Sequence, residues 1–258
     1  MRSTIGLTMV ALSALICLTT APSHAALVRG TGASEVLFGL DDDNVDDPEV
    51  QPEGVAANQS LNNADMIDGR GGHDVLIGLL GSDTIDGGPG DDVIIGGTEQ
   101  GQAPNSDIQL GNRGNDVAIW AGGDGSDLFD GGDGNLDALV FGTIDRVDNI
   151  PVLSPATGKY RDTGLPTADV TGQGGFCELE AVADPQTRGY EFLVRFFSRS
   201  TGNLLVTVRT HDVEQVFCTS EAGGAITYAD LTVDDPAFVE VSLDQVEKLN
   251  RTVRAIIR

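Results

Sequence analysis

The sequence predicts an all-β protein in which a parallel β-roll of glycine- and aspartate-rich nonapeptide repeats is followed by a small, mostly antiparallel β domain. Three observations lead to this prediction. Glycine, aspartate and aliphatic residues recur with a period of nine in the first half of the chain. The second half loses that period and contains short runs of β-branched and aromatic residues. That half also holds a pair of cysteines, Cys177 and Cys218.

The repeats are clearest in three consecutive blocks, Gly69–Ile77, Gly78–Asp86 and Gly87–Ile95. Each block has glycine near its start, glycine at the fourth place, aspartate at the sixth and an aliphatic residue at the eighth. Self-similarity at a fixed period is the signature of a coiled repeat architecture. The repeats therefore predict a coil rather than a glycine-rich linker, which would not need an aliphatic residue at every eighth position.

Looser copies extend the array over residues 26–142. Ser60–Asp68 precedes the clear blocks, and Gly30–Phe38 carries Glu35 in the aspartate place. Later copies are a partial one that opens at Asp107, then Gly111–Ile119, Gly122–Asp130 and Gly131–Asp137. Two insertions interrupt the array: an acidic segment over 40–58, expected to be a solvated loop or alternatively a separate cation site, and a shorter one near 98–106. Gln109 and Ala118 are weak core residues, and extra residues near Trp120 and Leu136 disturb the register.

The turn of each repeat has the chemistry of a calcium ligand. The pattern Gly-Gly-x-Gly-x-Asp forms a tight turn with exposed carbonyl oxygens, since glycine adopts backbone conformations that a Cβ atom forbids. The three residues that follow, such as Val75–Ile77, form a short strand whose middle side chain points into the core. Carboxylate and carbonyl oxygens suit calcium, whereas zinc prefers His or Cys and magnesium keeps most of its water. His73 is accordingly expected to be an exposed turn residue rather than a ligand.

Two nonapeptides make one coil turn, so aspartates 18 residues apart are expected to stack on one edge. With the insertions looped out, one edge is expected to carry Asp65, Asp83, Asp107 and Asp127. The opposite edge is expected to carry Asp74, Asp92, Asp116 and Asp137. Carboxylates stacked at the strand spacing of about 4.8 Å repel one another unless cations lie between them.

These blocks resemble the repeats-in-toxin, or haemolysin-type, calcium-binding nonapeptides. The resemblance covers the array from Gly30 to Gly142 and implies a β-roll whose calcium ions are held by sixth-place aspartate side chains and turn carbonyls. The implied ligands are the eight aspartates above and the fourth-place glycines Gly72, Gly81, Gly90 and Gly125.

Charge limits the class of partner. The chain contains 40 Asp and Glu against 15 Lys and Arg, for a net charge of −25. Most of the excess lies in residues 26–142, whose basic residues are Arg29, Arg70 and Arg113. Such a surface repels phosphate backbones and anionic lipid, so nucleic acid is excluded as a partner.

Residues 1–25 have the pattern of a secretory signal peptide. Arg2 precedes an apolar run from Ile5 to Leu18, and Ser23-His24-Ala25 suits cleavage after Ala25. The run is shorter than the roughly 20 residues that span a bilayer, so no membrane span is expected. We therefore expect a secreted, extracellular protein, with the periplasm or the cell surface as alternatives.

Residues 143–258 are expected to form a β-rich C-terminal domain. Tyr190–Phe197 and Leu204–Val208 flank the turn residues 200–203 and predict a hairpin, and Ala225–Leu231 and Phe238–Leu243 predict further strands. The tail from 244 to 258 can be read as a helix or a strand. Since Cys17 leaves with the signal peptide, Cys177 and Cys218 remain as an even pair in an oxidising compartment and suggest a disulfide, with free thiols or a metal pair as alternatives.

Three classes of function fit this sequence. The first is a non-enzymatic calcium-binding protein with a structural or adhesive role, whose repeats fold on binding several calcium ions. The second is a secreted hydrolase with its catalytic part in the C-terminal domain. The sequence contains no His-Glu-x-x-His or Gly-x-Ser-x-Gly motif, and His211 beside Asp212 is expected to be a surface pair rather than a catalytic dyad. The third is a C-terminal domain that binds a protein or glycan partner at the cell surface.

Overall fold

We describe a computed structural model of the chain. It describes residues 27–39, 64–79, 81–97, 106–120, 122, 124–142, 146–147, 150–151, 174–223 and 225–241. The signal-peptide segment 1–25, the acidic segment 40–58 and the tail 244–258 lie outside the described residues. Within the described ranges, no helix has the length and apolar character needed to cross a membrane.

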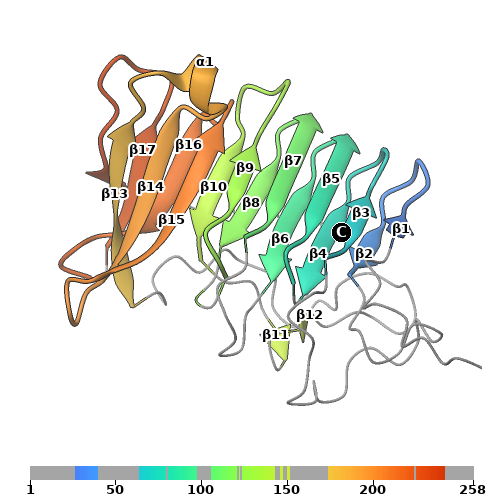
Figure 1. Ribbon diagram of the computed structural model, residues 1–258, viewed down its shortest axis with the longest axis horizontal. Coiled ribbons are helices and arrows are strands. Elements are labelled where there is room, and N and C mark those ends of the chain that lie inside the picture. Colours follow the sequence, from blue (N-terminus) through green and yellow to red (C-terminus); the bar gives the residue numbers. More distant parts are fainter. Residues whose placement is uncertain are drawn as a thin grey trace, which may run out of the picture.

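Two eight-stranded sheets form the two broad sides of a flattened coil (Figure 1). The first sheet contains, in spatial order, β1 (Leu27–Arg29), β3 (Met66–Asp68), β5 (Thr84–Pro89), β7 (Ile108–Arg113), β9 (Leu128–Asp130), β15 (Leu204–His211), β14 (Phe192–Ser198) and β13 (Gly175–Ala181). The second contains β2 (Val36–Phe38), β4 (Val75–Leu79), β6 (Val93–Gly97), β8 (Val117–Trp120), β10 (Ala138–Phe141), β16 (Gln215–Thr219), β17 (Ile226–Asp230) and β18 (Val239–Glu240). Apart from these sheets, β11 (Arg146–Val147) pairs with β12 (Ile150–Pro151), and α1 spans Pro185–Arg188.

Strands of the repeat array pair in parallel and alternate between the two sheets. Ile67 lies beside Ile85 in the first sheet, and Leu76 lies beside Ile94 in the second. In these turns each residue lies next to the one 18 positions later, so that two strands and two turns make one coil turn. This arrangement confirms the predicted parallel β-roll.

The core between the sheets is filled by the middle residue of each short strand. Ile67, Ile85 and Phe129 of the first sheet and Leu76 and Ile94 of the second are completely buried. Burying each of these side chains contributes about 1.5–3 kcal/mol. Two weaker residues occupy the same middle places, Gln109 in β7 and Ala118 in β8, and both are buried as well.

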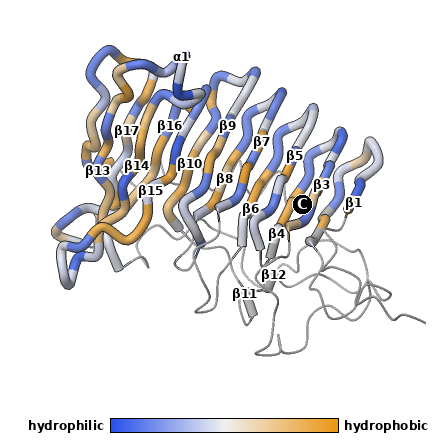
Figure 2. Tube along the Cα trace, in the orientation of Figure 1, coloured by the Kyte–Doolittle hydropathy of each residue, from blue (hydrophilic) through white to orange (hydrophobic). Residues whose placement is uncertain are grey.

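The outer faces of the two sheets differ. In the second sheet the residues on either side of the middle one, such as Val75 and Ile77, are also buried and form a second apolar cluster. In the first sheet the corresponding places hold residues such as Thr84 and Asp86, which are partly exposed. Figure 2 shows apolar residues along the strands and hydrophilic residues in the turns at the upper edge of the coil.

The C-terminal strands extend the same two sheets. β15 pairs in parallel with β9, and β16 pairs in parallel with β10. Beyond these junctions the pairing becomes antiparallel through β14 and β13 on one side and through β17 and β18 on the other. The predicted hairpin is confirmed by the pairing of β14 with β15, and the two further strands are confirmed as β17 and β18. Neither β13 nor β16 was predicted from the sequence.

A disulfide and an aromatic cluster join the sheets at this end of the coil. Cys177 of β13 in the first sheet is bonded to Cys218 of β16 in the second, which confirms the predicted disulfide. Trp120 lies 5.2 Å from Phe141 and 5.1 Å from Phe196, measured between ring centroids. Since Phe196 belongs to β14, this cluster packs the last turns of the array against the C-terminal strands.

Candidate metal centre

A ladder of aspartates follows one edge of the coil. The backbone amide of Asp65 donates to Oδ1 of Asp83 at 2.8 Å, and that of Asp83 donates to Oδ1 of Asp107 at 2.8 Å. The amide of Asp107 in turn donates to Oδ1 of Asp127 at 2.9 Å. These four residues are the set that the 18-residue spacing predicts for this edge.

The opposite edge repeats the arrangement. Amides of Asp74, Asp92 and Asp116 donate at 2.7 Å to Oδ1 of Asp92, Asp116 and Asp137, respectively. The extra residues near Trp120 and Leu136 therefore do not shift Asp116 or Asp137 out of the ladder. The structure brings all eight predicted aspartates into two edge rows and buries each of them almost completely.

Glutamates extend the second row at both ends. The amide of Glu35 donates to Oδ1 of Asp74 at 2.7 Å, as expected from its place in a repeat. At the other end the amide of Asp137 donates to Oε2 of Glu214 at 2.8 Å. Glu214 was not predicted from the sequence, because it lies in no nonapeptide. The only local signal is an acidic residue immediately before an apolar strand.

The fourth-place glycines line the turns of the same edge. Gly72, Gly90 and Gly114 have φ angles of 127°, 153° and 146°, which disfavour any residue with a side chain. A Cβ atom on Gly90 would overlap the carbonyl oxygen of Gly72, one on Gly114 would overlap that of Gly90, and one on Gly134 would overlap that of Gly114. The carbonyls thus follow one another along the edge beside the aspartates. Gly114 and Gly134 belong to this row although the prediction omitted them.

Two predicted glycines lie on the first edge. Gly81 has a φ of 135°, like its counterparts on the second edge. Gly125 differs, because its carbonyl oxygen accepts a hydrogen bond of 3.0 Å from Nε1 of Trp120. One lone pair of this predicted ligand is therefore already engaged.

Burial makes the ionised form of the aspartates in the second row unfavourable. Oδ2 of Asp74, Asp92, Asp116 and Asp137 is buried and has no hydrogen-bond partner among the described residues. Burial raises the pKa of Asp74 to about 6, those of Asp92 and Asp137 to about 7, and that of Asp116 to about 8, with the neighbouring carboxylates adding to the effect. A hard divalent cation fits these atoms, since it satisfies oxygens that no protein donor reaches.

The glycines beside the aspartates keep space at these oxygens. A Cβ atom on Gly87 would lie 2.5 Å from Oδ2 of Asp92, and one on Gly111 would lie 2.5 Å from Oδ2 of Asp116. Glycine at the start of a repeat thus keeps this side of the carboxylate open. The donor set consists of carboxylate and carbonyl oxygens, which favours calcium over zinc.

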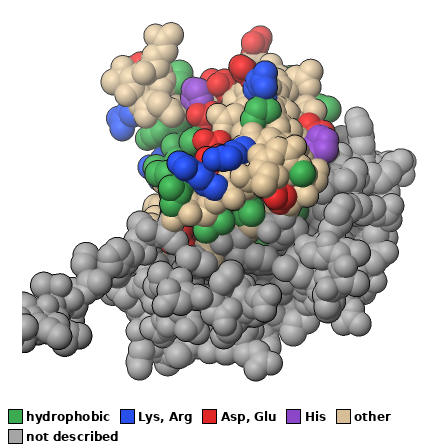
Figure 3. All heavy atoms as spheres, turned by 90° about the vertical axis from the view of Figure 1, so that its right-hand side faces the viewer, with side chains coloured by type: hydrophobic (Ala, Val, Ile, Leu, Met, Phe, Trp, Pro, Cys, Tyr) green, Lys and Arg blue, Asp and Glu red, His purple; other side chains and the backbone are tan. Residues whose placement is uncertain are grey.

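The end of the coil at β1 carries a different group of charges. Arg29 and Arg70 both form ion pairs with Asp68, at 3.6 and 3.8 Å. Figure 3 views the molecule from this end and shows basic side chains beside acidic ones. His73 is exposed, as predicted, and its Nδ1 accepts a hydrogen bond of 2.8 Å from the amide of Asp91.

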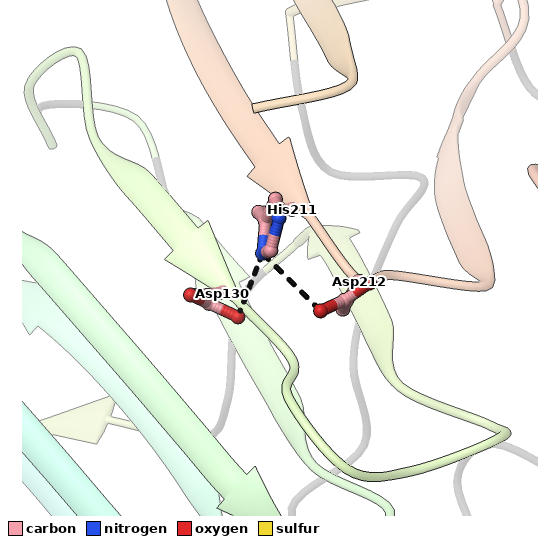
Figure 4. Close-up of side chains that lie close together, drawn as sticks. All are labelled: Asp130, His211 and Asp212. Atoms are coloured by element: carbon pink, nitrogen blue, oxygen red, sulfur yellow. Dashed lines mark ion pairs between the residues drawn. The ribbon is translucent and has the colours of Figure 1, made fainter. Parts of the chain in front are cut away.

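His211 lies between two carboxylates where the array meets the C-terminal strands (Figure 4). Its Nδ1 is 3.3 Å from Oδ1 of Asp130 and 3.3 Å from Oδ2 of Asp212. Partial burial lowers the pKa of His211, but the hydrogen bond and charge of Asp130, together with Asp212, outweigh this effect and raise the pKa above its ordinary value. When the imidazole is protonated, its contact with Asp130 is an ion pair that links the end of β15 to β9.

Comparison with known families identifies the repeat segment. Residues 64–100 match the family model of the RTX calcium-binding nonapeptide repeat in four copies. This match confirms the resemblance for a segment that contains Asp65, Asp74, Asp83 and Asp92. No curated protein and no solved structure matches the chain significantly.

Proposed function

Because residues 64–100 are RTX repeats, which bind calcium ions, we propose that this chain is an exported protein whose coil folds as several calcium ions bind along its two edges. We propose that its role is structural or adhesive. One observation carries the proposal. The carboxylate oxygens Oδ2 of Asp74, Asp92, Asp116 and Asp137 are buried in a row without hydrogen-bond partners among the described residues. A folded coil with these groups ionised needs cations beside them.

The proposed ligands are the aspartate side chains and glycine carbonyls of the two edges. The carboxylates are Asp65, Asp83, Asp107 and Asp127 on one edge and Asp74, Asp92, Asp116 and Asp137 on the other. The carbonyls belong to Gly72, Gly81, Gly90 and Gly125. Asp107, Asp116, Asp127 and Asp137 lie outside the matched segment. Support for them comes from ladder hydrogen bonds of 2.7 and 2.9 Å, close to the 2.7 and 2.8 Å inside it.

Calcium supply would couple export to folding. Without a cation, the buried carboxylates oppose the coil, and burial of short aliphatic side chains has to overcome that penalty. With calcium, the binding free energy adds to the free energy of folding. Extracellular calcium modules bind with dissociation constants of about 10⁻⁴ to 10⁻³ M, which suits millimolar calcium outside the cell.

Export is supported by the signal-peptide pattern of residues 1–25 and by the disulfide between Cys177 and Cys218, a bond typical of oxidising compartments. We propose secretion to the extracellular medium, or retention in the periplasm or at the cell surface. The adhesive role would involve a protein or glycan partner there.

We propose a non-enzymatic role rather than hydrolysis. The hydrolase alternative would use His211 as its base, but the contacts of its Nδ1 with Asp130 and Asp212, at 3.3 Å each, are equally those of a surface pair that joins β9 to the end of β15. Assays of the full chain against ester, peptide and glycoside substrates test this point, and turnover that disappears in a His211→Gln variant would overturn it.

Calcium titration of the chain from Ala26 onward tests the proposed function. Calorimetry is expected to show uptake of several ions at micromolar to millimolar calcium, and circular dichroism is expected to show β structure that is lost on chelation and restored on readdition. Magnesium at the same concentration is the control and is expected to replace calcium poorly. A β spectrum that does not change with chelator, together with no calcium uptake, would refute the proposal.

A further inference from the structure

We propose that Glu214 is a calcium ligand that extends the row ending at Asp137, so that calcium fastens the C-terminal strands to the coil. This inference rests on the proposed function, since it assigns a further ligand to one of its edges. Glu214 lies outside the matched segment and outside every nonapeptide, and it belongs to the chain segment that enters β16.

The register places Glu214 where the next aspartate of the row would stand. Asp137 immediately precedes Ala138, and Glu214 immediately precedes Gln215. Ala138 and Gln215 are paired across the parallel strands β10 and β16. The amide of Gln215 donates to the carbonyl of Asp137 at 3.0 Å, as the amide of Ala138 donates to the carbonyl of Asp116 at 2.8 Å. The carboxylate of Glu214 accepts the amide of Asp137 as each aspartate accepts the amide one turn before it.

A carbonyl oxygen also occupies the expected place. A Cβ atom on Gly111 would meet the carbonyl oxygen of Gly131 in the next turn, and one on Gly131 would meet the carbonyl oxygen of Asp212. Asp212 thus replaces the first glycine of a repeat, and its positive φ of 46° is unusual for a non-glycine residue. The segment from Asp212 to Glu214 is shorter than a repeat turn. The additional methylene of glutamate, compared with aspartate, offsets part of that difference.

An unsatisfied, fully buried oxygen lies at this junction. Asp137 has no exposed surface, and its Oδ2 has no hydrogen-bond partner among the described residues. The amide of Asp137 donates to the carboxylate of Glu214, so both acidic side chains belong to this junction. A divalent cation there would satisfy the buried oxygen of Asp137 and offset the repulsion between the two carboxylates.

The other edge ends in a different way. There the guanidinium of Arg209 donates from Nη2 to the carbonyl of Ser126 at 3.0 Å and from Nε to the carbonyl of Asp127 at 3.4 Å. The C-terminal segment thus brings a positive charge to the last turn of one edge and a negative charge to the last turn of the other. The edge that receives Glu214 is the one that gains a cation ligand.

The experiment compares the full mature chain with its Glu214→Gln variant and with Glu240→Gln as control, because Glu240 is exposed on β18. Glutamine keeps an oxygen that can accept the amide of Asp137 but removes the charge. In calorimetry, Glu214→Gln is expected to lose one of the calcium-binding steps or to weaken it about tenfold. Calcium is expected to slow reduction of the Cys177–Cys218 disulfide in wild type and in Glu240→Gln, and clearly less in Glu214→Gln.

The outcomes separate the two proposals. Calcium uptake and disulfide protection equal in Glu214→Gln and wild type would overturn the inference and leave the proposed function standing. No calcium uptake by any of the three chains would overturn both. Hydrogen exchange of wild type gives a reading that does not depend on the variant folding. Calcium is expected to protect amides of residues 214–219, and unchanged exchange there, with protection at β6, would overturn the inference.

Discussion

The amide of Asp92 donates a 2.7 Å hydrogen bond to Oδ1 of Asp116, although 24 positions separate these residues. Asp74 and Asp92, one turn earlier, make the same bond across 18 positions. The inserted residues therefore leave the ladder unchanged. Each aspartate is held by its place before a buried strand, and its relation to the next turn does not depend on the length of chain between them.

Asp116→Asn is expected to change stability in opposite directions with and without calcium. The carboxylate is fully buried, and burial raises its pKa to about 8. Above pH 8 and without calcium, the neutral amide is expected to stabilise the coil by about 1–3 kcal/mol, because no buried charge remains. With calcium the variant is expected to bind at least about tenfold more weakly, since the charge of the ligands sets affinity. Urea unfolding with and without chelator measures both effects.

Asp235→Asn is the matched control for this substitution. Asp235 is exposed in the turn after β17 and belongs to neither edge row. The unfolding midpoint and the calcium affinity of the Asp235→Asn variant are expected to equal those of wild type. A parallel loss in both variants would show that net charge, rather than ligation at the edge, determines calcium binding.

Stability of the calcium-free coil is expected to fall as the pH rises from about 4 to about 8. Asp74, Asp92, Asp116 and Asp137 have folded-state pKa values raised from 3.8 to between about 6 and about 8. In that window the folded chain binds more protons than the unfolded chain, so folding weakens with each rise in pH. Thermal unfolding in chelator at a series of pH values tests this slope, and a stability that increases with pH would contradict it.

The same pKa shifts predict that calcium binding releases protons near pH 6.5. Protonated carboxyl groups must ionise before they bind the cation. The apparent binding enthalpy at that pH is therefore expected to depend on the ionisation enthalpy of the buffer, and this dependence should fade near pH 9. Calorimetry in two buffers at each pH provides the measurement.

Gly90→Ala is expected to disrupt the second edge. Its φ of 153° disfavours a side chain, and the added methyl group would overlap the carbonyl oxygen of Gly72. Such strain costs of order 1–3 kcal/mol and displaces a carbonyl proposed as a ligand. Gly32→Ala is the control, since a Cβ atom there meets nothing within 4 Å. Equal calcium affinity and equal unfolding midpoints in the two variants would contradict the assigned geometry of the turn.

Reduction of the disulfide is expected to destabilise the chain by about 4 kcal/mol in saturating calcium, because the bond closes a loop between cysteines 41 positions apart. The loss should be largest at the C-terminal strands, where Cys177 and Cys218 join the two sheets. Urea unfolding with and without reductant measures the effect. A Cys177→Ser, Cys218→Ser double variant should not respond to reductant.

The repeat array could be predicted because its information is local and periodic. Glycine at the fourth place and aspartate at the sixth define a turn, an aliphatic residue defines the strand, and the constant spacing defines which residues stack. The edge assignments of Asp107 and Asp137 hold despite insertions, because the buried strand after each aspartate determines its place. The hairpin of β14 and β15 was predictable for a similar reason, since its turn residues and strand residues are adjacent in the sequence.

The sequence by itself thus determined the coil, the two rows of aspartates and the preference of their oxygens for calcium. Only the tertiary structure decided how the coil ends. It brings Glu214 to one edge and Arg209 to the other through parallel pairing of β16 with β10 and of β15 with β9, and it directs Trp120 onto the carbonyl of Gly125. These contacts join residues of which some lie more than 70 positions apart. Their partners are chosen by packing of the two sheets, and no repeat in the sequence encodes that choice.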